Sequence, residues 1–260
     1  MISQINYTID ELSSMKKYPK ELFYIGNTKL LEKQKVSIVG TRRPNAYTKE
    51  FTHKLSQKLS QANICIVSGA AMGVDAISHK AANTNNTIAV VANGLDIRYP
   101  SINKNLIKDI ESNGLMLSAY KEGEKARAYT FVLRNEIVVA LGDILIVSEA
   151  DIKSGSLTSV QYALDMGKKV YTLPHRLNES LGTQELVRKG LIEPIYDIDK
   201  FVNDISPKEL IQSPIIQDEF LNFCSSSPLY DEAVLKYSDK VFEYELLGKI
   251  EIKNGKIFVL

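Results

Sequence analysis

The chain has no tryptophan, only two cysteines and three histidines among its 260 residues. Cys65 and Cys224 are too far apart and too isolated to indicate a disulfide framework or a metal-ligand spacing. The histidines add no ligand cluster, so we expect neither a metal nor a cofactor. The formal net charge is only +1, so a nucleic-acid partner would have to be bound by a local group of basic residues.

Long hydrophobic runs are also missing. No stretch approaches the ~18 consecutive apolar residues that cross a bilayer, and the first residues lack the basic and apolar regions of a signal peptide. We therefore expect a cytoplasmic protein with no membrane partner. With 44% hydrophobic and 24% charged residues, the chain suits one large globular domain and a small appendage.

Five short runs rich in β-branched residues predict a buried sheet, because their apolar residues are nearly continuous and do not alternate. The segments between them place apolar residues such as Leu55 and Leu59 on one helical face. This alternation predicts an α/β fold, a Rossmann-like doubly wound parallel sheet with right-handed crossovers. The predicted strands are Val36–Val39, Ile64–Ser68, Thr87–Val91, Asp143–Ser148 and Lys169–Leu173.

The sequence also predicts how the chain is organised. Residues 1–33 show no clear period and are interpreted as a leader that packs on the Rossmann-like domain, 34–202. A linker, 203–215, contains Pro207 and Pro214. Residues 216–260 predict a small winged-helix-like domain, because helical segments are followed by Asn254-Gly255, a strong hairpin signal.

Ligands of an open parallel sheet collect where strands end and helices begin. The first predicted strand ends in Gly40-Thr41-Arg42-Arg43. Glycine permits close backbone approach there, free helix amides favour an anion, and the arginines add planar donors for phosphate. A tight turn with solvated arginines would have the same sequence.

The second predicted strand ends at Ser68 and is followed by Gly69, Gly73 and Asp75 among small residues. This arrangement suits a phosphate cradle at a helix start, although glycine turns are frequent in α/β proteins. The turn matches neither the nicotinamide fingerprint nor the Walker P-loop.

Two further stretches belong to the same sheet edge. Phe131, with Arg134 and Asn135 close behind it, could stack a base while the arginine meets the backbone; core packing is the usual role of a single phenylalanine. The run Lys153-Ser154-Gly155-Ser156 offers amides, two hydroxyls and an ammonium group at a helix start. Three such turns together predict an anion-binding site.

Taken in order, these motifs resemble those of the DNA-processing protein A (DprA, or Smf) family of bacteria. The resemblance covers roughly residues 20–195, and the organisation is most similar to that of epsilonproteobacterial members, with a small C-terminal domain and no N-terminal helical module. Any one motif is permissive, whereas the ordered set is highly specific. The motifs are Val39-Gly-Thr-Arg42, Ser68-Gly-x-Ala-x-Gly-Val-Asp75, Gly94-Leu-Asp-x-x-Tyr-Pro100, Phe131-x-x-Arg-Asn135, Lys153-Ser-Gly-Ser-Leu157 and Gly182-Thr-x-x-Leu186.

The resemblance implies a homodimeric protein that binds and protects single-stranded DNA and helps to load the recombinase RecA during natural transformation, without catalysis. By motif, Arg42 would grip a phosphate, Phe131 would stack a base, and the other residues would line the pocket. The resulting DNA- and phosphate-binding set is Gly40, Thr41, Arg42, Arg43, Ser68, Gly69, Gly73, Asp75, Phe131, Arg134, Asn135, Lys153, Ser154, Gly155 and Ser156.

The sequence departs from the family pattern at three places. Glu136 stands where the family usually has an arginine, and Ala128 stands where related members place a lysine. His175 replaces the glycine that usually follows the proline after the last strand. These changes bear on affinity more than on fold.

Two alternatives of other classes remain. Related Rossmann-like proteins hydrolyse N-glycosidic bonds of nucleoside monophosphates, but their signature ends in a catalytic glutamate, whereas the helix start at Lys153 reaches Gln161 without one. Ser68 and Ser156 have no histidine–carboxylate pair beside them in the sequence. The other alternative is a nucleotide-sensing scaffold with no role on DNA.

The last part of the chain is acidic. From Pro214 onward it carries five basic and eight acidic residues, and five minus eight is −3. A winged helix that grips DNA is expected to be basic. We therefore predict that this part docks a protein or the chain's own Rossmann-like domain and binds duplex DNA poorly.

Overall fold

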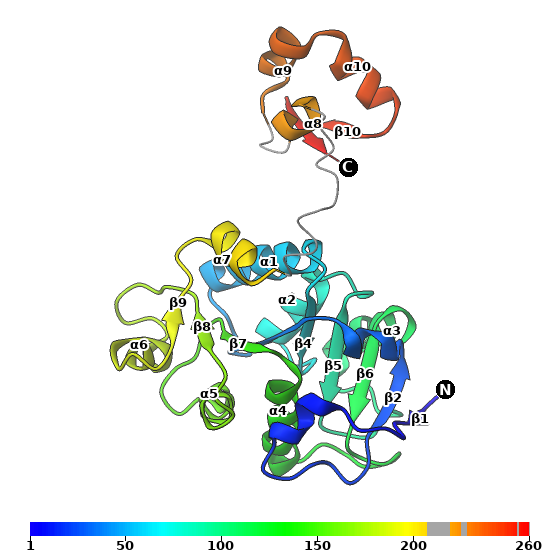
Figure 1. Ribbon diagram of the computed structural model, residues 1–260, viewed down its shortest axis with the longest axis vertical. Coiled ribbons are helices and arrows are strands. Elements are labelled where there is room, and N and C mark those ends of the chain that lie inside the picture. Colours follow the sequence, from blue (N-terminus) through cyan, green and yellow to red (C-terminus); the bar gives the residue numbers. More distant parts are fainter. Residues whose placement is uncertain (207–218, 225–227, 254, 260) are drawn as a thin grey trace. The chain divides into compact units, whose positions relative to one another are not determined.

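The computed structural model describes residues 1–206, 219–224, 228–253 and 255–259 (Figure 1). The chain divides into two compact units, 1–207 and 208–260. The first unit is built on a sheet that has nine strands among the described residues, and the second on short helices and a hairpin. Each unit has its own hydrophobic core.

The large sheet runs in the order β1-β2-β6-β5-β4-β3-β7-β8-β9. The strands from β6 to β9 along this order are parallel, while β2 pairs antiparallel with β6, and β1 with β2. The chain order reverses between β3 and β7, which lie side by side. The strands are β1 Ser3–Gln4, β2 Phe23–Gly26, β3 Lys35–Val39, β4 Cys65–Ser68, β5 Thr87–Val91, β6 Leu115–Ser118, β7 Ile144–Val147, β8 Val170–Thr172 and β9 Glu193–Pro194.

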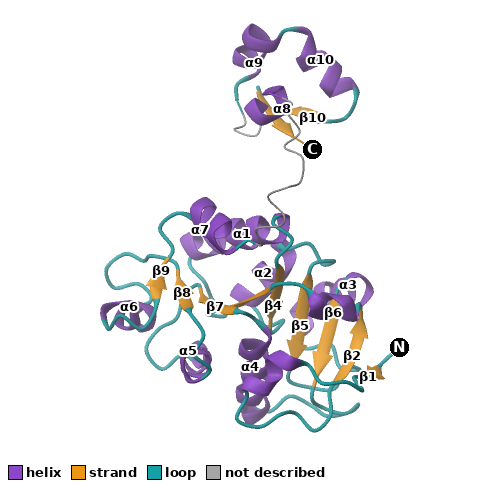
Figure 2. Cartoon of the chain, in the orientation of Figure 1, coloured by secondary structure: helices purple, strands orange, loops and turns teal. Residues whose placement is uncertain are grey.

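Helices cover both faces of the sheet (Figure 2). The pair α4 and α5 packs on one face with a short 3₁₀ helix, Asp10–Ser14, and α1, α2, α3 and α7 lie on the other. This layering is the doubly wound arrangement that the sequence predicted. The helices are α1 Ala46–Gln61, α2 Val74–Ala81, α3 Lys104–Asn113, α4 Ala128–Leu141, α5 Gly155–Asp165, α6 Leu181–Arg188 and α7 Ile198–Ile205.

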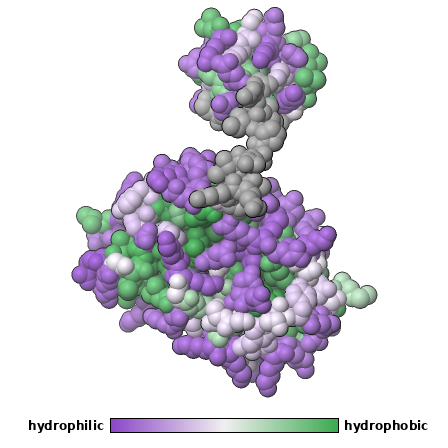
Figure 3. Space-filling view, in the orientation of Figure 1, coloured by the Kyte–Doolittle hydropathy of each residue, from purple (hydrophilic) through white to green (hydrophobic). Residues whose placement is uncertain are grey.

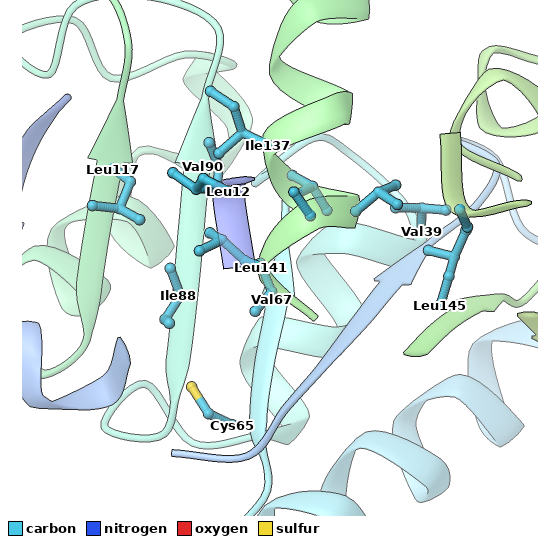
Figure 4. Close-up of a cluster of buried hydrophobic side chains, with 14 of the residues drawn as sticks. Leu12, Val39, Cys65, Val67, Ile88, Val90, Leu117, Ile137, Leu141 and Leu145 are labelled. Carbon is cyan, nitrogen blue, oxygen red and sulfur yellow. The ribbon is translucent and has the colours of Figure 1, made fainter. Parts of the chain in front are cut away.

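The core alternates across the sheet because successive side chains of a strand point to opposite faces. Val67 packs in the cluster beneath α4, whereas Ile66 packs in the cluster beneath α1. Figure 4 shows the first cluster, in which Ile137 and Leu141 of α4 meet strand residues. Cys65 lies in this cluster, and burial raises the pKa of its thiol to about 12. It is therefore the inert, protonated thiol that its apolar neighbours predicted.

The five predicted strands are confirmed as β3, β4, β5, β7 and β8, with ends that differ by at most one residue. Strand β6 was missed because Leu115–Ser118 has no β-branched residue to mark it. The interpretation of residues 1–33 as a leader differs from the structure. This segment supplies β1 and β2 to the sheet, and Leu12 and Leu22 to its core.

The second unit follows the element order of a winged helix. Its hydrophobic core is small and includes Phe220, Ala233, Val241, Ile250 and Ile257. The predicted hairpin is confirmed by antiparallel pairing of its strands, although Asn254 itself lies outside the described residues. The predicted linker, 203–215, begins inside helix α7, which ends at Ile205, and from residue 207 onward it lies outside the described residues. The elements are α8 Glu219–Cys224, α9 Tyr230–Tyr237, α10 Asp239–Leu246, β10 Ile250–Lys253 and β11 Lys256–Val259.

None of the helices in the described ranges combines the length and apolar character that crossing a membrane requires.

A buried lysine ties the N-terminal segment to the sheet. The side chain of Lys35, at the start of β3, is only 3% exposed and lies 2.6 Å from the carboxylate of Glu11. Its ammonium group also donates to the carbonyls of Leu31 (2.7 Å) and Lys33 (2.8 Å). A charge this deep is tolerated because each of its protons has an acceptor.

Lys35→Met should therefore lower the free energy of unfolding by about 3 kcal/mol, because it leaves two carbonyls and a carboxylate without their donor. Denaturant unfolding monitored by circular dichroism measures the change. The exposed Lys17→Met is the control and should change stability little. Equal stability of both variants would show that the buried ammonium group is dispensable.

Candidate nucleic-acid interface

A cleft of about 670 Å³ opens where β3 and β7 end side by side. This is the point at which the strand order reverses, the usual ligand site of a doubly wound sheet. The turn after β3, the start of α4 and the start of α5 form its walls. The lining residues are Val39, Gly40, Thr41, Arg42, Arg43, Ala71, Asp75, Ala128, Phe131, Val132, Arg134, Asn135, Ser154, Gly155, Ser156, Thr158 and Ser159.

The turn after β3 is held by a backbone contact to the segment after β7 and leaves its two arginines exposed. The amide of Thr41 donates to the carbonyl of Glu149 (2.9 Å), which ties the ends of β3 and β7 together. The loop between β4 and α2 packs directly against this turn at Gly73. Gly73 has a φ of +77°, and a Cβ at this position would lie only 2.4 Å from the carbonyl oxygen of Thr41. Gly73 is therefore required for the position of Arg42, and Arg42 and Arg43 project toward solvent.

Phe131 lies within cation–π distance of two arginines of the cleft. The guanidinium carbon of Arg42 is 5.4 Å from the centroid of its ring, and that of Arg134 is 5.8 Å away. Tyr99 approaches the same ring with a centroid separation of 6.2 Å. Cation–π attraction thus couples the aromatic ring to the charge of the cleft.

The start of α5 forms the opposite wall. Ser154 caps this helix by accepting a hydrogen bond from the amide of Ser156 (3.2 Å). Gly155 faces open space, so a ligand can approach its amide at the positive end of the helix, where an anion is favoured. The amides of Ser156 and Leu157 are already bonded to Ser154. Lys153 precedes this turn, exposed and with a φ of +71°, and does not line the cleft.

The loop Gly69–Ala71, after β4, has every peptide group bonded within the protein. Asp75 accepts from the amides of Gly69 (3.2 Å) and Ala71 (3.3 Å), and His79 accepts from the amide of Ala70 (3.3 Å). Asn103 donates to the carbonyls of Ala70 and Ala71 (both 3.0 Å), and Arg134 donates to the carbonyl of Gly69. The amides of Gly69, Ala70 and Ala71 therefore offer no free donor to a phosphate. Phosphate binding by the wider turn, which runs on through Gly73, stays a prediction.

Arg134 is a buried part of the cleft wall, which it stabilises by donating to backbone carbonyls. Its residue is 4% exposed, and its guanidinium also donates to the carbonyl of Val90 (2.7 Å) and to the side chain of Asn135 (3.1 Å). Burial lowers the pKa of Arg134, and the nearby Asp75 carboxylate opposes that change. Burial likewise raises the pKa of Asp75, against the opposing effects of Arg134 and the loop amides.

His79 has a defined tautomer. Thr87 donates its hydroxyl proton to the carbonyl of Ile66 (2.8 Å), so it accepts from Nδ1 of His79 (2.6 Å). Nε2 is then the acceptor for the amide of Ala70. A second proton on the ring would face that amide donor to donor. Burial and the charge of Arg134 lower the pKa of His79 to about 3.

The structure brings most of the predicted site residues into one cleft. Arg42, Arg43, Phe131, Asn135 and the Ser154–Ser156 turn line it as predicted. Ser68 does not reach it, because its buried hydroxyl donates to the carbonyl of Ile38 (2.6 Å). Asp75 and Arg134 lie in its wall with their polar atoms engaged.

The departures from the family pattern have different structural consequences. Glu136 is buried away from the cleft and accepts a hydrogen bond from the amide of Lys16 (3.0 Å), so it does not reduce the charge of the cleft. Ala128 lines the cleft, where a lysine would have added charge. His175 packs beside Tyr47 and bonds the carbonyl of Ser148 (2.7 Å).

Sequence reasoning missed Asn103 and Thr158. Asn103 lies far along the chain from the loop that it holds, and the sequence carries no signal of that pairing. Thr158 lines the cleft four residues after Ser154, the separation that places side chains on one face of a helix. That spacing could have identified it.

The fold and the cleft together define a Rossmann-like α/β protein with a cleft, lined by exposed arginines, at the switch point of its sheet. The family model for DNA recombination-mediator protein A matches residues 2–206. The chain therefore belongs to this family, which confirms the resemblance of its motifs.

Known relatives agree in sequence and in structure. The chain is 38% identical over 184 residues to DNA processing protein DprA of Streptococcus pneumoniae, covering 69% of this chain and 65% of that protein. It is 38% identical over 180 residues to Protein Smf of Synechocystis, covering 66% of this chain and 45% of that protein. The matches thus span less than two thirds of these relatives' lengths.

Two solved structures have the same architecture. DNA processing protein A of Helicobacter pylori, described for its single-stranded DNA binding mode, matches with a TM-score of 0.77 and 40% identity over 78% of this chain and 94% of that one. The X-ray structure of DprA from Streptococcus pneumoniae matches with a TM-score of 0.72 and 33% identity over 78% of this chain and 74% of that one.

The neutral His79 makes stability depend on pH. The unfolded chain binds a proton at this residue below about pH 6.5, whereas the folded protein excludes it down to about pH 3. Its contribution to stability is therefore complete above pH 6.5 and is lost as the pH falls, by up to about 1.4 kcal/mol per pH unit.

His79→Gln should flatten the pH dependence of the unfolding free energy between about pH 6 and pH 4. Chemical denaturation across that range measures the slope. The control is His53→Gln on the exposed surface of α1, which should keep the slope of the wild type. Parallel slopes for wild type and His79→Gln would contradict a buried neutral imidazole.

Proposed function

We propose that this protein binds single-stranded DNA in the cleft between the ends of β3 and β7. In this proposal it protects the strand and helps to load RecA onto it during natural transformation, without catalysing a reaction on DNA. The observation that carries the proposal is the convergence of Arg42, Arg43, Phe131 and the start of α5 on one cleft.

The chemistry of the cleft suits a single strand. Exposed guanidinium groups and the Gly155 amide at the start of α5 are partners for backbone phosphates, and Phe131 offers a ring on which a base can stack. A duplex keeps its bases stacked inside, so it cannot use that ring. The single-stranded DNA binding described for the Helicobacter pylori protein, at 40% identity, supports the same ligand.

The groups that could act as a base beside the cleft support binding over catalysis. The carboxylate of Asp75 accepts two amides and Nε2 of His79 accepts a third, so both are committed to the loop Gly69–Ala71. These contacts favour a rigid binding surface over the N-glycosidic hydrolase alternative.

Arg42→Ala should weaken binding of oligo-dT by about 1–3 kcal/mol, because a charge-assisted contact to phosphate is lost. Fluorescence anisotropy with labelled oligo-dT and a matched duplex, at two salt concentrations, measures the change. The wild type should prefer the single strand and bind it less tightly as salt rises.

Lys58→Ala is the matched control, because it removes one positive charge from α1, where Lys58 pairs with Asp199 outside the cleft. It should bind oligo-dT like the wild type. An Arg42→Ala protein with unchanged affinity would move the site elsewhere, and equal affinity of the wild type for duplex would remove the proposed selectivity.

We further propose that two copies of the chain associate through an apolar surface around α6. A shallow cleft of about 560 Å³ lies there, lined by Ile152, Leu181, Val187, Pro194 and Tyr196 among others. Figure 3 shows apolar residues gathered on this side of the first unit. Exposed apolar surface of this kind typically marks an interface, and a dimer would present two DNA clefts, which increases avidity on long strands.

Leu181→Glu should convert the proposed dimer into a monomer, because it places an unpaired charge in an apolar interface. Light scattering after size-exclusion chromatography measures the mass. Ile102→Glu changes an exposed apolar residue outside this surface and should leave the mass at that of the wild type. A monomeric wild type would refute the dimer, and a dimeric Leu181→Glu would refute its placement.

A further inference from the structure

The second unit has the framework of a DNA-binding winged helix without the corresponding chemistry. Helix α8, an isolated bridge between Leu229 and Lys256, helices α9 and α10, and the hairpin β10–β11 follow one another in the order of that fold. In this order α10 occupies the position of the recognition helix, which reads the major groove in DNA-binding members. Its inner side is anchored by the buried Val241.

The outer side of α10 presents acidic and apolar residues and is flanked by the exposed Lys240. Asp239, Phe242, Glu243 and Leu246 follow the spacing i, i+3, i+4, i+7, so they share one helical face. All four are exposed, with Phe242 at 68% and Leu246 at 72%. We call these four residues the α10 face.

This face is unsuited to DNA. Recognition helices present arginine, lysine, asparagine or glutamine to base edges, whereas carboxylates repel the phosphate backbone. Two nearby lysines already lie over aromatic rings, Lys249 at 4.6 Å from the centroid of Tyr244 and Lys236 at 4.9 Å from that of Phe223. The net charge of −3 from Pro214 onward also disfavours DNA as the ligand of this unit.

We propose that the α10 face docks a cationic amphipathic helix of a partner protein. Exposed apolar side chains at helical spacing are the anchors of helix-in-groove recognition, and Asp239 and Glu243 would pair with lysines or arginines on that helix. A second copy of this face is disfavoured as the occupant, because a two-fold interface would place its carboxylates against one another.

The test uses the full-length chain and a labelled helical peptide of leucine and lysine, about 18 residues long, or five turns. The control peptide has glutamate in place of lysine. Fluorescence anisotropy should show that the wild type binds the cationic peptide at least about tenfold more tightly than the anionic one, with salt weakening the binding.

The variant Phe242→Ser/Leu246→Ser should lose at least about tenfold in affinity for the cationic peptide. Both residues are exposed, so the fold should persist, which circular dichroism checks. The matched control, Ile102→Ser, removes an exposed apolar residue from the first unit and should bind like the wild type.

Three results would overturn the proposal. The cationic peptide could fail to bind the wild type, or could bind the double variant equally well. Alternatively, the double variant could lose duplex DNA binding or self-association that the wild type possesses, which would make DNA or a second copy the occupant. The oligo-dT affinity of the double variant reports separately on the DNA cleft of the first unit.

Discussion

The candidate site depends on one buried set of hydrogen bonds, which holds the loop Gly69–Ala71. Side chains from three helical segments, Asp75, His79, Asn103 and Arg134, satisfy all of its amides and carbonyls. Unpaired peptide groups at this depth would each cost on the order of 1–3 kcal/mol. The loop is therefore rigid, and it supports the turn that carries Arg42, which packs against Gly73 directly behind it.

The polar groups around the cleft fall into two sets, those bonded within the protein and those exposed to solvent. In the glycine-rich turn after β4, the peptide groups of Gly69–Ala71 are bonded within the protein. The exposed arginines after β3 and Gly155 at the start of α5 line the cleft instead. Arg134 shows the same division, because a guanidinium that is 4% exposed stabilises backbone carbonyls and the ring of Phe131. The exposed guanidinium groups of Arg42 and Arg43 face the cleft, whereas the buried guanidinium of Arg134 holds its neighbours in place.

The sequence was most informative where chemistry is local. Continuous β-branched runs gave five parallel strands to within one residue, and the glycines, arginines and hydroxyls at their ends predicted one shared edge. It failed where contacts join distant segments. Leu115–Ser118 carries no β-branched signal, residues 1–33 form part of the sheet, and Asn103 reaches the loop from another helix. Pairing across many residues leaves no local period in a sequence.

By itself, the sequence determined the α/β class, the family and the sheet edge at which the candidate site residues gather, because strand periodicity, turn chemistry and ordered motifs can be identified along the chain. Only the tertiary structure decided which of those polar groups face solvent. Ser68, Asp75 and Arg134 carry the same atoms as any binding residue, but burial gives each an internal partner. A polar group can serve a ligand only when the fold leaves its hydrogen-bonding capacity unused, and that is a property of the packed molecule.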